Sequence, residues 1–202
     1  MATITGAKGG KQKQHTPVEQ PDSAQSMARC RMLLALGEGE FAGGLDATRI
    51  YLDGTPLGNA DGSMNFENVF WDFRPGTQMQ DPIPGFPAVE NETTIGVALT
   101  NATPWTRAFS NTQIDAVLVR IGISGLQQQE SNGDIVGTSV TYHIDVAIDG
   151  GAYETVMTKT VTEKLSSLYE LTHRINLPKA STGWQIRVVR DTADSTSQLL
   201  QN

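Results

Sequence analysis

The fold is decided by the stretch VTYHIDVAI at residues 140–148, followed at once by DGG at residues 149–151. Large apolar side chains occupy almost every second position of the first stretch. Because successive side chains of a strand point to opposite faces, this period of two predicts a half-buried β-strand. The Asp-Gly-Gly sequence tolerates positive φ and predicts a tight turn. The stretch therefore predicts a hairpin whose second strand occupies residues 153–161.

Further strand patterns lie on both sides of this hairpin. Residues 114–123 form a nearly continuous run of aliphatic side chains, which predicts a strand covered on both faces. The polar residues 125–137 predict an exposed loop. Apolar and polar side chains alternate again at residues 171–175 and 184–188, with Pro178 ending the first of these strands.

Strands at this spacing, with no clear helical pattern between them, predict an antiparallel β-sandwich over residues 111–191. A short helical turn at residues 166–169 is the alternative that the pattern leaves open. Trp184 lies in the apolar register of the last strand, and we expect it to fill the core. His173 falls on an apolar register too, where a partly buried and hydrogen-bonded imidazole is expected. His143 falls on the polar face of its strand.

The first half of the chain carries weaker strand signals. The apolar run at residues 32–36 fits a strand or a helical turn, and close glycines favour the strand. Residues 48–52 followed by Asp53-Gly54 predict a hairpin. The aromatic-rich residues 65–73 predict a strand with two partly covered faces. Together these patterns predict a β-rich segment over residues 28–110.

A proline-rich stretch interrupts this segment at residues 75–92. Proline lacks a backbone donor and restricts the residue before it, so no regular structure is expected there. Long loops without secondary structure often contact partners.

The N-terminal residues 1–27 differ in composition from the rest. Their first part, residues 6–14, is rich in glycine, lysine and glutamine and lacks apolar side chains large enough to offset the entropy of ordering. They predict a flexible basic arm in a chain whose net charge is −7 at pH 7. Three lysines form a weaker pattern than the basic clusters that bind nucleic acid, so no specific nucleic-acid binding is expected.

No pattern of residues predicts a catalytic, cofactor or metal site. His15, His143 and His173 are the three histidines, and their spacing does not match a metal-binding motif. Cys30 is the single cysteine, which excludes an internal disulfide and a cysteine-based zinc site. We expect Cys30 to be a small buried side chain. The chain is therefore not expected to be an enzyme.

Two partial motifs fail on their spacing. Residues 59–65 contain Asn and Asp around Gly62, but they do not follow the order of a calcium-binding loop. Residues 6–11 contain glycines and lysines, but no strand pattern precedes them and no Ser or Thr follows Lys11. No apolar run approaches the length of a membrane-spanning helix or resembles a secretion signal, so we expect a soluble protein made in a cytoplasm.

Five groups of residues occur in the same order and at similar spacing in a known family. They are His15-Thr16-Pro17, the run from Leu36 to Gly43, the run from Asn68 to Gly76, Thr103-Pro104-Trp105-Thr106-Arg107, and Arg187 to Arg190 with the polar residues up to Asn202. In these groups the chain resembles the N-terminal part of the lambda-type phage tail tip attachment proteins, also called host specificity proteins J. The sequence departs from the family pattern at Glu40, where proline is usual.

The resemblance implies a structural part of a siphophage or prophage tail tip. It implies a homotrimeric hub that meets other tail-tip proteins, a β-rich hub segment followed by a fibronectin-like sandwich, and a polar connection at residues 192–202 to downstream parts that contact the host receptor. This chain would then be an N-terminal fragment located at the virion tail tip. The residues expected at a partner interface are Lys8, Lys11, Lys13, His15, Pro17, Phe73, Pro82, Pro84 and Phe86.

A carbohydrate-binding β-sandwich is the alternative from a different functional class. Aromatic side chains in an acidic β-protein can stack on sugar rings, and Trp71, Phe73, Trp105 and Trp184 motivate this reading.

Overall fold

The computed structural model describes residues 15–26, 29–86 and 91–202. The chain divides into two compact units: Met1–Met27 with Ile95–Asn202, and Ala28–Thr94. We call them the sandwich unit and the loop unit. Each is described by itself.

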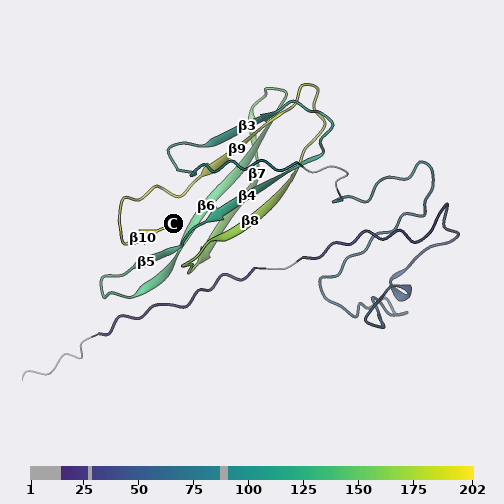
Figure 1. The fold of residues 1–202 in the computed structure, drawn as a ribbon, viewed down its shortest axis with the longest axis horizontal. Helices are drawn as coiled ribbons and strands as arrows, with labels where there is room; N and C mark the ends of the chain where they lie inside the picture. Colours follow the sequence, from purple (N-terminus) through teal and green to yellow (C-terminus); the bar gives the residue numbers. More distant parts are fainter. Residues whose placement is uncertain (1–14, 27–28, 87–90) are drawn as a thin grey trace, which may run out of the picture. The chain divides into compact units, whose positions relative to one another are not determined.

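The sandwich unit contains two antiparallel sheets (Figure 1). The larger sheet has the strand order β10-β5-β6-β9-β3, with β7 also paired to β6, and the smaller sheet consists of β4 and β8. The strands of the larger sheet are β3 (Trp105–Phe109), β5 (Gln127–Gln129), β6 (Ile135–Ile148), β7 (Tyr153–Glu163), β9 (Trp184–Arg190) and β10 (Leu200–Gln201). Those of the smaller sheet are β4 (Ala116–Ile123) and β8 (Tyr169–Asn176).

The predicted central hairpin is confirmed. Strand β6 pairs with β7 from Thr138 to Ala147, and it also pairs with β5 and β9. Asp149 and Gly150 take φ angles of 51° and 75° in the turn, as the Asp-Gly sequence predicts. The strands predicted around residues 171–175 and 184–188 are β8 and β9.

The core lies between the two sheets in two clusters of buried side chains. The first contains Val119, Ile144, Val146, Ile175, Trp184, Ile186 and Val188, and the second Ile123, Leu126, Val140, Tyr142, Val161 and Leu165. Trp184 is 4% exposed, and its Nε1 donates to the carbonyl oxygen of Pro178 at 2.8 Å. The predicted core position of Trp184 is therefore confirmed.

Two expectations for this unit are wrong, and the alternative of a helical turn is not realised. Strand β4 is covered on one face only, because Leu118 is 49% exposed while Val119 and Ile123 are buried. A two-stranded sheet packed on one side leaves its other side in solvent. The region 125–137 is not simply a loop, since β5 and the start of β6 lie in it; a polar strand pairs through its backbone and needs no apolar pattern. Residues 166–169 form no helical turn, and Tyr169 begins β8.

The loop unit has little regular structure among its described residues. It contains the 3-10 turn η1 (Ala47–Arg49) and the short strands β1 (Tyr51–Leu52) and β2 (Thr55–Pro56). Asp53 and Gly54 connect the two strands with φ angles of 48° and 75°, which confirms the predicted hairpin. Residues 75–86 form no helix or strand, as their prolines predict. No helix among the described residues is long and apolar enough to cross a membrane.

Two strands predicted in the loop unit are absent. Residues 32–36 are extended but pair with no strand among the described residues, and a strand without a partner leaves its backbone groups unpaired. Residues 65–73 do not form a strand because Asn68 takes a φ of 58°, which breaks the extended backbone. Cys30 is exposed rather than buried, since it precedes this unpaired run and is not covered.

Candidate partner-binding surfaces

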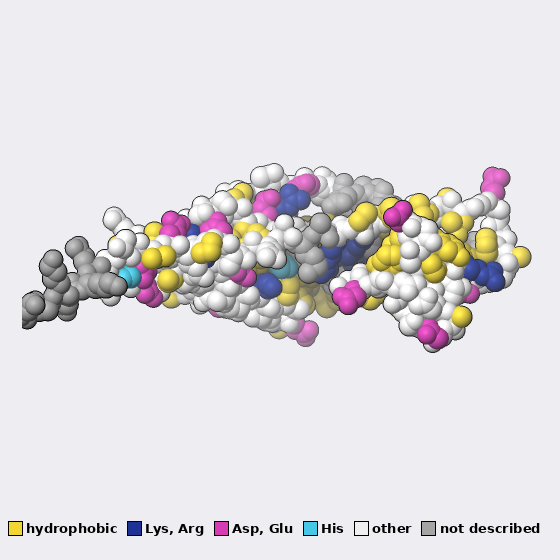
Figure 2. All heavy atoms as spheres, turned by 90° about the horizontal axis from the view of Figure 1, so that it is seen from below, with side chains coloured by type: hydrophobic (Ala, Val, Ile, Leu, Met, Phe, Trp, Pro, Cys, Tyr) yellow, Lys and Arg dark blue, Asp and Glu magenta, His cyan; other side chains and the backbone are white. Residues whose placement is uncertain are grey.

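The apolar segment, residues 32–36, is the most unusual surface of the loop unit. Met32, Leu33, Leu34 and Leu36 are between 56% and 70% exposed. Soluble proteins expose apolar side chains singly, whereas consecutive exposed leucines mark an interaction site. Figure 2 shows hydrophobic side chains gathered on the visible face of the loop unit.

The loop unit exposes further large apolar side chains. Phe70 and Met79 are each 92% exposed, and Tyr51 is 59% exposed. Among the described residues of this unit, Leu57 is the only buried hydrophobic side chain. The described part of the unit thus has almost no core, and its apolar side chains are available to another protein.

The predicted interface residues of the proline-rich loop differ in their surroundings. Phe73 packs edge-on against Phe41, with ring centroids 5.4 Å apart, and is half-buried. Phe86 is half-buried as well, whereas Pro82 and Pro84 are exposed. The prolines therefore lie on the free surface, and Phe73 helps to hold the loop.

Arg74 fixes the shape of the same loop. Its Nε donates to the carbonyl oxygen of Asp81 at 2.7 Å, and its Nη1 donates to the carboxylate of Asp72. Hydrogen bonds from the Arg74 side chain and from the backbone of Phe73 lower the pKa of Asp72. The loop without helix or strand is thus held in place by side-chain hydrogen bonds.

The N-terminal interface residues fall into two groups. Lys8, Lys11 and Lys13 lie outside the described residues. His15 and Pro17 belong to an extended segment, residues 15–26, which we call the strap. His15 Nε2 lies 2.8 Å from Asp134 Oδ1, and Pro17 lies against Gly133. The described part of the predicted arm thus lies along the sandwich unit.

Lys164, which sequence reasoning missed, contributes two ion pairs to the binding of the strap. The Lys164 side chain is 1% exposed, and its Nζ donates to Glu19 Oε1 and to Asp22 Oδ1, both at 2.9 Å. The partners are separated by more than 140 residues in the chain, so no local pattern connects them. Lys164 lies between Glu163 and Leu165 just after β7, where no sequence pattern marks it as buried.

A second polar cluster lies on the outer face of the larger sheet. Asp145 of β6 is 1% exposed and accepts from Thr155 Oγ1 at 2.7 Å and from Arg187 Nε at 2.8 Å. Burial alone would raise the pKa of Asp145, but the hydrogen bonds from Thr155 and Arg187 outweigh it and lower the pKa. The Arg187 guanidinium stacks on the Tyr153 ring at 4.0 Å. These groups satisfy one another, so the cluster joins β7, β6 and β9.

The two histidines in the strands of the sandwich unit, His143 and His173, have ordinary structural partners. His143 Nδ1 lies 2.8 Å from Asp191 Oδ1, which places it on the polar face as predicted. His173 Nε2 lies 2.7 Å from the hydroxyl of Tyr142, which confirms the predicted half-buried and hydrogen-bonded imidazole. Burial lowers the pKa of His173, with a contribution from Lys159, and burial raises the pKa of Tyr142 to about 12.

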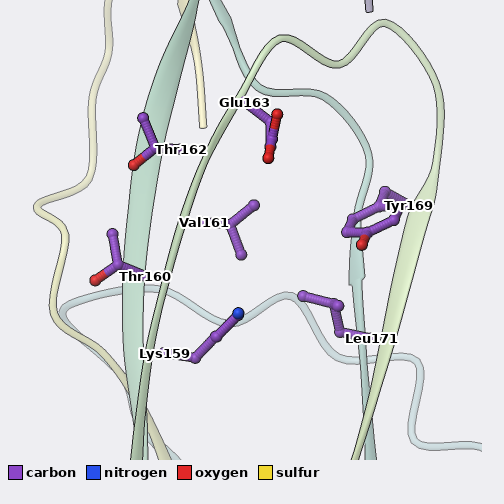
Figure 3. Close-up of a pocket in the computed structure, with 7 residues that line it drawn as sticks. All are labelled: Lys159, Thr160, Val161, Thr162, Glu163, Tyr169 and Leu171. Atoms are coloured by element: carbon purple, nitrogen blue, oxygen red, sulfur yellow. The ribbon is translucent and has the colours of Figure 1, made fainter. Parts of the chain in front are cut away.

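A small cavity lies between β7 and β8. Figure 3 shows Val161 on the side of β7 toward β8, and Leu171 and Tyr169 on β8. Its volume is about 100 Å³, well below the roughly 300–1,000 Å³ of typical small-molecule sites. No group of three His, Cys, Asp or Glu side chains among the described residues is arranged to hold a metal ion.

The aromatic side chains that suggested sugar binding do not form a common platform. Trp184 is in the core, and Trp105 packs against the same core cluster. Trp71, 39% exposed, belongs to the loop unit with Phe73. The residues that motivated this alternative are therefore divided between a core and a separate unit.

Comparison with known proteins identifies the family. Residues 89–202 match the family described as "Tip attachment protein J, FNIII-A domain". The chain belongs to the tip attachment protein J family. This match covers the sandwich described above and confirms both the expected fibronectin-like fold and the resemblance seen in the sequence.

Two relatives in this family match nearly the whole chain. The tip attachment protein J of Escherichia phage SECphi4 is 53% identical over 204 residues, which cover 98% of this chain and 18% of that protein. The tip attachment protein J of Escherichia phage SECphi27 is 39% identical over 194 residues, which cover 96% of this chain and 16% of that protein. The chain thus spans less than a fifth of the length of these relatives.

Proposed function

We propose that this chain is the N-terminal hub portion of a phage or prophage tail tip, with a structural role in tail assembly. Its membership in the tip attachment protein J family supports the location in the virion tail. The observation that carries the assembly role is the loop unit, which exposes consecutive leucines and has almost no core among its described residues. An apolar surface of this kind is stabilised when a neighbouring protein covers it.

The proposed partners are other copies of the same protein, in a homotrimer, and other proteins of the tail tip. The exposed Pro82 and Pro84 and the apolar segment supply the contact surface. Contact with the host receptor is assigned to other parts of the full-length protein, and synthesis to the host cytoplasm. We propose no catalytic activity, because the buried polar groups described above pair with one another.

Co-purification tests this function. The full-length protein that carries this chain is co-expressed with the other tail-tip proteins of its phage. The complex is then isolated, and its molar mass is measured by light scattering. We expect a trimer that retains the other tail-tip proteins. A monomer that retains none of them would contradict the proposal.

A double variant, Leu33→Ser with Leu34→Ser, locates the contact. These side chains are 60% and 70% exposed, so the substitution should leave folding unchanged while it weakens the association. Leu168→Ser is the matched control, because Leu168 is 65% exposed but lies in the sandwich unit. If the control and the double variant lose association equally, the result contradicts a specific role of the apolar segment.

A further inference from the structure

The strap adds to β6 of the sandwich unit through one parallel bridge, between Glu19 and Ile135. The Ile135 N–H donates to the carbonyl oxygen of Val18 at 3.0 Å, and the Gln20 N–H donates to that of Ile135 at 2.9 Å. Further along, the Ser23 N–H donates to the carbonyl oxygen of Lys164 at 3.0 Å. Figure 1 shows the strap, in dark purple, passing the end of the sandwich where β6 begins and β7 ends. Strand addition of this kind is a common way to bind an extended peptide.

Lys164 recognises two carboxylates of the strap. A buried ammonium group is costly unless it is paired and hydrogen-bonded, and Glu19 and Asp22 provide this pairing. The hydrogen bonds that Lys164 donates to Asp22 and Glu19 raise the pKa of Lys164. Those from Ser166 and Lys164 lower the pKa of Asp22 to about 2. The Lys164 ammonium group and the Asp22 carboxylate are therefore charged near neutral pH.

The sandwich unit also recognises an Asp-Ser pair in the strap. The second carboxylate oxygen of Asp22 accepts from the backbone N–H and the hydroxyl of Ser166, at 3.1 and 2.6 Å. The Ser23 hydroxyl donates to Glu163 Oε2 at 2.5 Å and accepts from the Lys164 N–H at 2.9 Å. The site thus recognises an extended segment with a carboxylate at position 19 and Asp-Ser at positions 22 and 23.

The strap itself remains on the surface. Among its residues only Ala24 is half-buried, where it packs against the second core cluster, while Glu19 and Asp22 keep side-chain exposures of 58% and 39%. Its binding therefore depends on polar contacts and adds almost nothing to the core. A segment held in this way can leave its site without opening the sandwich.

The strap is also a tether of the loop unit. The chain passes from the strap into residues 28–94 and returns to the sandwich unit at residue 95. The loop unit is consequently attached at two points, through the covalent chain at residue 95 and through the bound strap.

We infer that Lys164, with residues 134–137 and 163–166, forms a site for an extended acidic peptide, and that the strap is its resident and releasable ligand. The site acts as a latch: when the strap is bound, the loop unit has two attachments, and when the strap is released, it has one. This inference rests on contacts within the sandwich unit and does not depend on the proposed role in the tail.

Hydrogen exchange of the 202-residue chain tests whether the two carboxylates hold the strap. In the double variant Glu19→Gln with Asp22→Asn, we expect the hydrogen-bonded strap amides of Val18, Gln20 and Ser23 to exchange at least about tenfold faster, because the buried Lys164 ammonium group loses both of its charged partners. Amides of β6 and β9 should keep their exchange rates. The charge-matched control, Glu154→Gln with Glu170→Gln, should leave the strap unchanged. Equal strap exchange in wild type and the Glu19/Asp22 variant would overturn the inference.

A labelled peptide with the sequence of residues 15–26 tests the binding site directly. We expect it to bind the Glu19→Gln/Asp22→Asn chain, whose own strap is weakened, at least about tenfold more tightly than wild type, whose strap occupies the site. A peptide carrying the same two substitutions should not bind. Lys164→Met in the Glu19/Asp22 variant should abolish binding of the unaltered peptide. If the unaltered peptide does not bind, or if both peptides bind equally, the proposed peptide-binding site is overturned.

Discussion

At the scale of the residue, Asp149 shows how one carboxylate joins two loops. Its side chain accepts from the backbone N–H groups of Ser181, Thr182 and Gly183, and thereby connects the β6–β7 turn to the segment before β9. These backbone hydrogen bonds, chiefly those from Thr182 and Ser181, lower the pKa of Asp149 to about 2.

The lowered pKa of Asp149 predicts a pH-dependent contribution to stability. Because the folded-state pKa is below the unfolded value of about 3.9, the stabilisation is fully present above pH 4 and is lost as the pH falls through about 2. Asp149→Asn should therefore lower the Tm at pH 7, and the difference from wild type should narrow between pH 4 and pH 2. Thermal unfolding followed by circular dichroism measures both. A Tm difference between the two proteins that stays constant from pH 4 to pH 2 would contradict the stabilising role of the Asp149 carboxylate.

Trp184 supplies a second prediction at this scale. Because its ring fills the core and leaves a cavity when removed, Trp184→Ala should lower the free energy of unfolding of the sandwich unit by about 3–5 kcal/mol. Trp71→Ala, in the loop unit, should change it by less than about 0.5 kcal/mol. Denaturant titration followed by far-ultraviolet circular dichroism measures both changes. A near-neutral effect of Trp184→Ala would place the ring outside the core.

Single residues differed in how far the sequence predicted them. The alternation in their own strands placed Trp184 and His173 correctly. Lys164 and Asp145 were missed because their partners come from distant strands or from the strap, and no local pattern reports such pairing. Cys30 was placed wrongly because burial was inferred from residue type without a strand to cover it.

At the scale of the element, strands were predictable where the pattern was long. Strand β6 spans 14 residues and carries its own period of two, followed by a turn that its residues specify. The runs at 32–36 and 65–73 are short or broken, and whether they become strands depends on a partner that the sequence does not name. The three glutamines of β5 were missed because a strand can pair through its backbone without carrying an apolar pattern.

Gly183 supplies a prediction for the pairing of β3 with β9. It precedes β9 with a φ of 131°, and a Cβ placed there would collide with the carbonyl oxygen of Phe109. Gly183→Ala should therefore lower the free energy of unfolding by about 1–3 kcal/mol. It should also speed amide exchange in β3. Gly37→Ala is the control, because a Cβ there meets nothing within 4 Å. Equal stability of the two variants would contradict the close approach seen at Gly183.

At the scale of the whole molecule, the chain combines a well-packed fibronectin-like unit with a loop unit of little regular structure. Composition and the ordered motifs predicted the family and the fold class, because both depend on patterns spread along the chain. The residues proposed to contact partners differ in exposure: Pro82 and Pro84 are exposed, whereas Phe73 packs on Phe41 and is half-buried. The exposed leucines became visible only when the predicted strand at 32–36 proved to be absent.

The central claim is that the loop unit binds other proteins of the tail tip, and tail assembly tests it most directly. A phage lacking its own tip attachment protein is supplied with the full-length protein carrying Leu33→Ser and Leu34→Ser, or carrying the control Leu168→Ser. Complete tails are then counted by electron microscopy. We expect the control to restore tails to the wild-type number and the double variant to reduce them at least about tenfold, since the two exposed leucines contribute several kcal/mol when buried. Wild-type numbers of complete tails with the double variant would contradict the claim.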